Sequence, residues 1–224
     1  MVFSDRRHAG RALAKLVAAE GVNADAVVLG LPRGGVPVAY EIAHTCALPL
    51  DVLVVRKLGA PGAPELAMGA LASGGDVVWN VDVLRSLHVS RQELYQTVER
   101  ERAELNRRER VYREGRPPIP IAERPIILVD DGLATGASMR VAIRTVQEFA
   151  SHVTVAVPVG AQSTCEELER DGIHVLCLER AANFGAVGMY YEDFSPTTDE
   201  EVRLLLTKAR KEFALQSARD QTST

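Results

Sequence analysis

The sequence lacks the features that mark several classes of protein. Its 224 residues include only three cysteines (Cys46, Cys165 and Cys177) and no Cys-x-x-Cys pair, so neither a disulfide framework nor a zinc knuckle is predicted. No apolar run approaches the roughly 20 residues that a membrane span needs, and the N-terminus shows no signal-peptide pattern. A net charge of −4 argues against general nucleic-acid binding. We therefore expect a cytoplasmic protein without a membrane partner.

Short apolar runs alternate with amphipathic helical patterns along the chain. Buried strands are predicted at 26–31, 50–55, 126–129, 153–159 and 174–178. Helices are predicted at 5–20, 36–46, 137–150 and 163–170, the last opened by a Ser163–Glu166 capping box. This alternation implies right-handed βαβ crossovers. The predicted fold is α/β and three-layered, a mostly parallel sheet with helices on both faces. We expect a single domain over 1–224, with its core at about 22–196 and a C-terminal helix at about 198–216.

The pattern changes between the second and third strands. Residues 58–64 hold two glycines and two prolines, which predicts a flexible loop. Residues 65–72 and 76–81 then predict a β-hairpin joined by 73–75, although the first arm also fits a helix. A capping box at Ser90–Glu93 opens an inserted, long, charged helix over about 90–113. Two interpretations of this helix are open: a solvated helix packed along one seam, or a surface for a homodimer or another partner. Its interleaved glutamates argue against nucleic acid.

The densest chemical signal is the stretch 126–138. Four β-formers end in two adjacent acids, Asp130 and Asp131, at the strand end where parallel sheets bind ligands. Small and flexible residues then open a helix, which is a ready anion site. These loop residues are Gly132, Leu133, Ala134, Thr135, Gly136, Ala137 and Ser138. The amides suit a phosphate, and the carboxylates suit sugar hydroxyls or a substrate-borne Mg²⁺. The pattern predicts a site for a sugar phosphate such as ribose 5-phosphate.

Other phosphate motifs do not fit this stretch. A P-loop would need a lysine after Gly136, and a dinucleotide fingerprint would need Gly-x-Gly-x-x-Gly. A phospho-receiver domain would need a further aspartate at a strand end, whereas Asp171 follows a predicted helix. A helix capped by an acidic turn, without a ligand, stays as the structural alternative.

The stretch from Val129 to Ser138 resembles the motif that binds phosphoribosyl pyrophosphate (PRPP) in type I phosphoribosyltransferases. That motif has four apolar residues, two acids and a Thr-Gly loop, and the order of elements resembles the family from about residue 26 to 194. The resemblance implies that loop 132–138 binds the 5′-phosphate and that Asp130 and Asp131 hold the ribose hydroxyls. It also implies Mg²⁺ as the cofactor, bound to this acidic pair through water or through the substrate.

The same resemblance assigns roles to three other segments. Arg33, Gly34 and Gly35, after the first strand, correspond to a loop that grips pyrophosphate and often has a non-proline cis peptide. Arg56 and Lys57 would act as catalytic cations beside the mobile loop 58–64.

In the late aromatic segment, Phe184, Tyr190, Tyr191 and Phe194 correspond to a hood that stacks on the acceptor, with Phe184 and Tyr190 as the candidate acceptor-binding residues, although core packing is an equal alternative. Relatives that act on 6-oxopurines carry an acid where this chain has Ala134. The identity of the acceptor therefore stays open.

These features predict Mg²⁺-dependent transfer of phosphoribose from PRPP to a nitrogenous, base-like acceptor, with release of pyrophosphate. The alternative is a PRPP- or nucleotide-sensing regulator without transferase activity, whose basic surface would lie on 106–113. Arg33 and Lys57 favour the enzyme, because a sensor has no leaving group to neutralise.

Overall fold

Five parallel strands form the central sheet of the computed structural model, which describes residues 2–74, 77–87 and 89–222. Their order is β2–β1–β6–β7–β8. The strands are β1 (Val27–Gly30), β2 (Leu50–Val52), β6 (Pro125–Val129), β7 (His152–Ala161) and β8 (His174–Ala181). The predicted parallel sheet is confirmed. Because the strands are parallel, the loops that follow β1 and β6 meet at one edge of the sheet.

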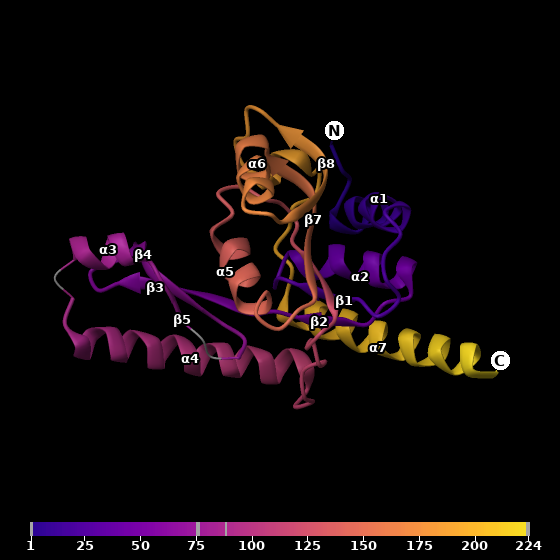
Figure 1. The fold of residues 1–224 in the computed structure, drawn as a ribbon, viewed down its shortest axis with the longest axis horizontal. Helices are drawn as coiled ribbons and strands as arrows, with labels where there is room; N and C mark the ends of the chain where they lie inside the picture. The colour runs from indigo at the N-terminus through magenta and orange to yellow at the C-terminus, as the bar shows by residue number, and fades with distance from the viewer. Residues whose placement is uncertain (1, 75–76, 88, 223–224) are drawn as a thin grey trace.

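Two hydrophobic clusters cover the two faces of this sheet, as expected from alternating side-chain directions along each strand. One cluster joins strand residues such as Val28 and Ile127 to the helices α1 (Arg6–Ala19), α2 (Gly35–Cys46) and α7 (Asp199–Thr222). The other joins Leu29 and Leu128 to the helices α5 (Ala137–Val146) and α6 (Gln162–Arg170). Figure 1 shows α1, α2 and α7 on one side of the sheet and α5 on the other.

The core and the C-terminal helix extend further than the sequence pattern predicted. Leu13 of α1 and Leu206 of α7 belong to the buried cluster, so the core reaches beyond 22–196 at both ends. Helix α7 continues to Thr222 rather than about 216. Helix α5 ends at Val146, four residues before the predicted end.

A separate antiparallel sheet forms an arm that projects from the body (Figure 1). It contains β3 (Val55–Ala60), β4 (Ala63–Ala72) and β5 (Val77–Trp79), in the order β3–β4–β5. The predicted hairpin is confirmed with its first arm as a strand; residues 75 and 76 of its turn lie outside the described residues. The predicted loop at 58–64 is wrong. These residues pair as β3 and β4 around a tight turn at Pro61–Gly62, where Gly62 has a φ of 76°.

Two helices complete the arm, the short α3 (Val81–Ser86) and the long α4 (Arg91–Arg113). The capping box of Ser90 and Glu93 is present as predicted. At the other end of α4, Arg113 donates to Asp51 of β2 at 2.9 Å, and these two side chains are only 8% and 7% exposed. Val98, Leu105 and Tyr112 are buried along one seam of α4. The helix therefore packs on the core along a seam.

The start of α6 differs from the prediction. Its N-cap is Ala161, with no hydrogen bond from a capping side chain, so the predicted capping box of Ser163 and Glu166 is wrong. Thr164 uses its hydroxyl instead to reach the loop after β6. Within 2–74, 77–87 and 89–222, no helix has both the length and the apolar character that crossing a membrane requires.

Candidate active site

The two adjacent acids stand directly after β6 and are packed against the glycine loop that follows β1. A methyl group placed on Gly34 would lie 2.0 Å from Asp131 Oδ2, and one placed on Gly35 would lie 2.6 Å from the carbonyl oxygen of Val129 and 2.8 Å from Asp130 Cα. Only glycine fits at both positions. The structure thus brings together two segments that lie far apart in the sequence, and both carry predicted site residues.

The glycine loop is held in place by backbone hydrogen bonds. The amide of Leu31 donates to the carbonyl of Val129 at 2.8 Å, and the amide of Gly35 donates to the carbonyl of Leu31 at 3.0 Å. The peptide between Pro32 and Arg33 is cis, as the resemblance implies. The side chain of Arg33 is 48% exposed and its Nη1 lies 3.8 Å from Asp199 Oδ1. Its guanidinium therefore faces solvent at the rim of the site.

The loop after the acidic pair is braced from β7 and α6. Leu133 exchanges two backbone hydrogen bonds with Val159 and Ala161, at 2.9 and 2.8 Å. The hydroxyl of Thr164 donates to the carbonyl of Ala134 at 2.7 Å. These contacts keep the loop rigid beside the acids, as a preorganised binding site requires.

The loop ends by opening helix α5. Gly136 is the N-cap residue, with a φ of 72° and no side-chain cap. The first amides of a helix have no partners within the helix, and the helix dipole makes this end attractive to anions. Four of the loop residues are exposed around this helix end: Ala134, Thr135, Ala137 and Ser138. This geometry fits the phosphate site that the sequence predicts.

Arg6, at the start of α1, is a site residue that the sequence analysis missed. Its Nε donates to Asp131 Oδ2 at 2.7 Å, and its Nη1 donates to the carbonyl oxygen of Ser195 at 2.8 Å. Its guanidinium carbon lies 3.9 Å from the ring centre of Phe194. Arg6 therefore links the acidic pair to the segment between β8 and α7. Only tertiary structure could reveal this contact, because Arg6 and Asp131 are 125 residues apart.

The protonation of the two acids reflects this crowded setting. Burial raises the pKa of Asp130, and the neighbouring charge of Asp131 raises it further. Burial also raises the pKa of Asp131, while the hydrogen bond from Arg6 opposes that shift. The Asp131 side chain is 14% exposed, and that of Arg6 is 11% exposed. A cation placed against two close carboxylates favours their charged forms.

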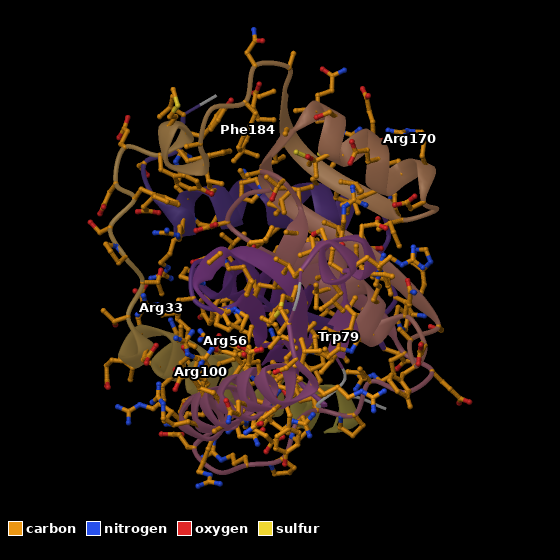
Figure 2. The ribbon with its side chains drawn as sticks, turned by 90° about the vertical axis from the view of Figure 1, so that its left-hand side faces the viewer. Arg33, Arg56, Trp79, Arg100, Arg170 and Phe184 are labelled. Carbon is orange, nitrogen blue, oxygen red and sulfur yellow. The ribbon has the colours of Figure 1, made fainter. Side chains whose placement is uncertain are left out.

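The aromatic residues of the predicted acceptor segment make two different sets of contacts. Phe184 and Tyr190 stack on each other, with ring centres 5.5 Å apart, and pack against the small cluster around Phe3. Tyr191 is the aromatic residue that reaches the acidic pair, because its hydroxyl donates to the backbone carbonyl of Asp131 at 2.6 Å. Viewed from the arm, Phe184 lies high on the molecule and Arg33 and Arg56 lie below it (Figure 2).

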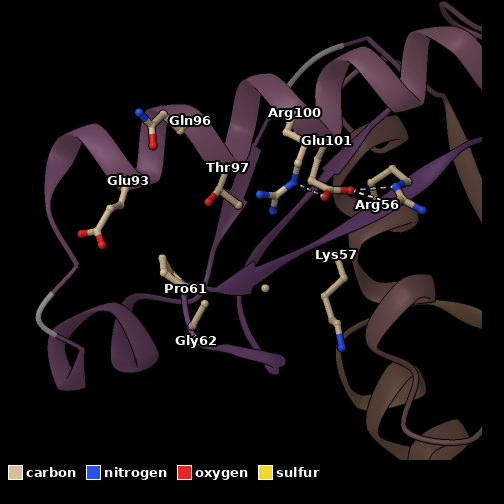
Figure 3. Close-up of a pocket in the computed structure, with 11 residues that line it drawn as sticks. Arg56, Lys57, Pro61, Gly62, Glu93, Gln96, Thr97, Arg100 and Glu101 are labelled. Carbon is tan, nitrogen blue, oxygen red and sulfur yellow. Dashed lines mark hydrogen bonds and ion pairs between the residues drawn. The ribbon is translucent and has the colours of Figure 1, made fainter.

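Arg56 and Lys57 point to opposite sides of strand β3 (Figure 3). Arg56 turns to α4, where it donates twice to Glu101 Oε2, at 3.0 and 2.6 Å. Both residues line a cavity of about 640 Å³ between the arm strands and α4. Lys57 also lines a second cavity, of about 550 Å³, together with Ala137 and Ser138 at the start of α5. Lys57 therefore lies towards the start of α5, whereas Arg56 pairs with α4.

Two further observations bear on the cofactor and on the regulator alternative. In the described ranges, no group of three or more histidine, cysteine or acidic residues is arranged to hold a metal ion. A metal at Asp130 and Asp131 would therefore need further ligands from a substrate or from water.

On α4, Arg107 and Arg108 both pair with Glu104. This pairing weakens the basic surface that a regulator would require.

Comparison with known proteins agrees with this geometry. The model of the phosphoribosyl transferase domain matches residues 6–193. Two Mycobacterium tuberculosis proteins, from strains CDC 1551 / Oshkosh and H37Rv and both provisionally named phosphoribosyl transferases, are 43% identical over 220 residues. The match covers 98% of this chain and 49% of each relative, so the chain spans about half of their length.

A solved structure, that of TT1426 from Thermus thermophilus, has 45% sequence identity and a TM-score of 0.80. The comparison covers 93% of this chain and 99% of TT1426. The α/β fold and the match over residues 6–193 agree with one another. The chain belongs to the phosphoribosyl transferase domain family.

Proposed function

We propose that this protein is a phosphoribosyltransferase that moves phosphoribose from PRPP to a nitrogenous acceptor and releases pyrophosphate. The observation that carries the proposal is the direct packing of the two glycines of the β1 loop against the acidic pair after β6. A sugar held by the acids would have its C1 substituent beside the glycine loop. The uncapped start of α5 lies at the other end of the acidic loop, in reach of a 5′-phosphate.

In this mechanism the protein positions the substrate and stabilises the charges that develop at C1 and on the leaving group. The carboxylates of Asp130 and Asp131 bind the ribose hydroxyls and stabilise the positive charge that develops at C1. Lys57 and the amides of the glycine loop bind the departing pyrophosphate. Mg²⁺, carried by PRPP, would supply further charge neutralisation next to the acidic pair. A nucleobase is the acceptor that we propose.

The chemistry requires that water stays away from C1, since water would hydrolyse PRPP. The arm carries Lys57 and borders the cavity at the start of α5, so it is the element that we expect to close over bound PRPP. The late aromatic segment, with Tyr191 bonded to the backbone of Asp131, would cover the opposite side.

The test is release of pyrophosphate from PRPP and Mg²⁺ across a panel of nucleobases. We expect at least one base to support release, and we expect the double variant Asp130→Asn/Asp131→Asn to lose turnover while it remains folded. Full activity in that double variant would contradict the proposal. PRPP binding without pyrophosphate release on any acceptor would favour the regulator alternative instead.

A further inference from the structure

Arg6 donates a hydrogen bond to a carboxylate, that of Asp131, which the proposed function assigns to substrate binding. Its Nε donates to Asp131 Oδ2 at 2.7 Å. The glycine loop also approaches the same oxygen, because a methyl on Gly34 would lie 2.0 Å from it. A ribose hydroxyl, or a metal on the substrate, that approached Asp131 Oδ2 would compete with Arg6 for this position. A ribose hydroxyl or a substrate-borne metal at Asp131 Oδ2 would thus weaken the hydrogen bond from Arg6.

A released Arg6 would lose its hydrogen bond to an anion. Its side chain is 11% exposed, and its other direct contacts are with neutral groups, the carbonyl of Ser195 and the rings of Phe194 and Tyr191. The charges of Asp130 and Asp193 also act on it, but neither acid accepts one of these hydrogen bonds. An arginine cannot lose its proton in a protein, and a largely buried charge without a counter-charge is unfavourable. A new anionic partner for this guanidinium would therefore stabilise the substrate-bound state.

We propose that Arg6 is a substrate-binding residue that exchanges Asp131 for an anionic group of the substrate. This inference rests on the proposed function and names a residue for the same site. Two groups have this chemistry: the pyrophosphate of PRPP, and an acidic substituent on the acceptor. The pyrophosphate is favoured because Arg6 lies next to the glycine loop that we expect to bind it, with Arg6 Nε 3.1 Å from a methyl placed on Gly34. An acidic substituent on the acceptor is favoured because Arg6 contacts Phe194 in the late aromatic segment.

The first experiment measures the affinity of inorganic pyrophosphate, without metal, by calorimetry. We expect Arg6→Gln to weaken binding at least tenfold and Arg6→Lys to weaken it less, because lysine keeps the charge but loses the planar donor pair. Arg11→Gln is the matched control on the same helix. Arg11 is 54% exposed and 3.8 Å from its acidic neighbour Glu41, so we expect no change. The melting temperature of each ligand-free variant shows whether it is folded.

The exchange itself predicts an unusual result for Asp131→Asn. Loss of this carboxylate removes the competitor for Arg6, so the variant should bind pyrophosphate more tightly, by several-fold, although it loses turnover. Removing any negative charge also helps an anion to bind. The double variant Asp131→Asn/Arg6→Gln separates these causes, because the gain should vanish when Arg6 is absent. A gain that persists in the double variant would overturn the inference.

The second experiment tests the acceptor side. In the presence of PRPP, the affinity of nicotinate is compared with that of nicotinamide, its neutral counterpart. If Arg6→Gln leaves pyrophosphate binding unchanged but abolishes a preference for nicotinate, the acceptor supplies the anion. If neither measurement changes in Arg6→Gln or Arg6→Lys, the inference fails while the proposed function stands. If the unaltered protein is not stabilised by PRPP and Mg²⁺, the proposed function fails, and this inference fails with it.

Discussion

Gly34 offers a direct test because the neighbouring Asp131, and not the backbone conformation of Gly34, excludes any larger side chain at this position. Its φ of −62° and ψ of −30° are available to any residue. An alanine methyl, however, would lie 2.0 Å from Asp131 Oδ2 and 2.7 Å from Asp131 Cγ, so the Asp131 carboxyl would have to move. Overpacking of this kind costs roughly 1–3 kcal/mol, and it would also disturb the contact between Asp131 and Arg6. We predict that Gly34→Ala lowers stability by this amount.

The same change should weaken PRPP binding at least tenfold, which corresponds to about 1.4 kcal/mol, because Asp131 would no longer stand in its binding position. Gly21→Ala is the control. Gly21 has a φ of 72° with nothing within 4 Å of an added methyl, so alanine there costs only backbone strain, roughly 1–2 kcal/mol. Chemical denaturation gives the stabilities, and titration with PRPP and Mg²⁺ gives the affinities. Equal PRPP affinity in Gly34→Ala and in the unaltered protein would refute the reasoning.

Three further predictions concern the surroundings of the site. Thr164→Val removes the hydroxyl that donates to the carbonyl of Ala134 at 2.7 Å. We expect a loss of about 1 kcal/mol in the free energy of unfolding and weaker phosphate binding by calorimetry. Unchanged phosphate affinity would show that this hydrogen bond is not needed for binding. Lys57→Gln removes a cation beside the phosphate loop, so we expect kcat/KM for PRPP to fall at least tenfold; a smaller change would assign the leaving group to other residues. Burial raises the pKa of Tyr112 to about 12, because the folded protein favours the neutral phenol. The contribution of Tyr112 to the free energy of unfolding is therefore fully present below the ordinary pKa of about 10, and it is lost as the pH rises towards 12. Urea unfolding of Tyr112→Phe should lack a pH-dependent loss of roughly 2–3 kcal/mol over this window, and identical pH curves for both proteins would contradict the assignment.

Local patterns in the sequence were sufficient for the central sheet and its helices. Apolar runs such as 126–129 match β6 because a strand covered on both faces has no polar position. The acids and glycines of the β6 loop were recognisable because their chemistry is contained in consecutive residues. The capping box at Ser90 was also visible, since it depends on two residues three positions apart.

The arm shows where local composition fails. Glycine and proline at 58–64 predicted a loop, but Pro61 and Gly62 form only the turn, and the flanking residues pair as strands. Gly69, elsewhere in this sheet, satisfies close packing, because a methyl there would lie 2.5 Å from the carbonyl oxygen of Val78. Such a requirement depends on a neighbouring strand and leaves no periodic signal.

The contacts of Arg6 and Tyr191 with Asp131 were beyond sequence reasoning for a related reason. Arg6 lies in an ordinary amphipathic helix, and Tyr191 in an irregular aromatic segment. Their contacts with Asp131 span 125 and 60 residues. Arg56 was assigned to catalysis by its position next to Lys57, whereas strand geometry sends the two side chains to opposite sides, so that Arg56 meets Glu101. Pairings of this kind are decided by tertiary structure.

The most direct test of the central claim is a thermal-shift titration of the unaltered protein with PRPP and Mg²⁺. A ligand that binds only the folded state stabilises it by about 2.7 kcal/mol at a concentration of about one hundred times Kd. For a protein of this size, that corresponds to a rise in Tm of roughly 5–10 °C. We predict a saturable rise in Tm with PRPP. No rise with PRPP at any concentration would contradict the account.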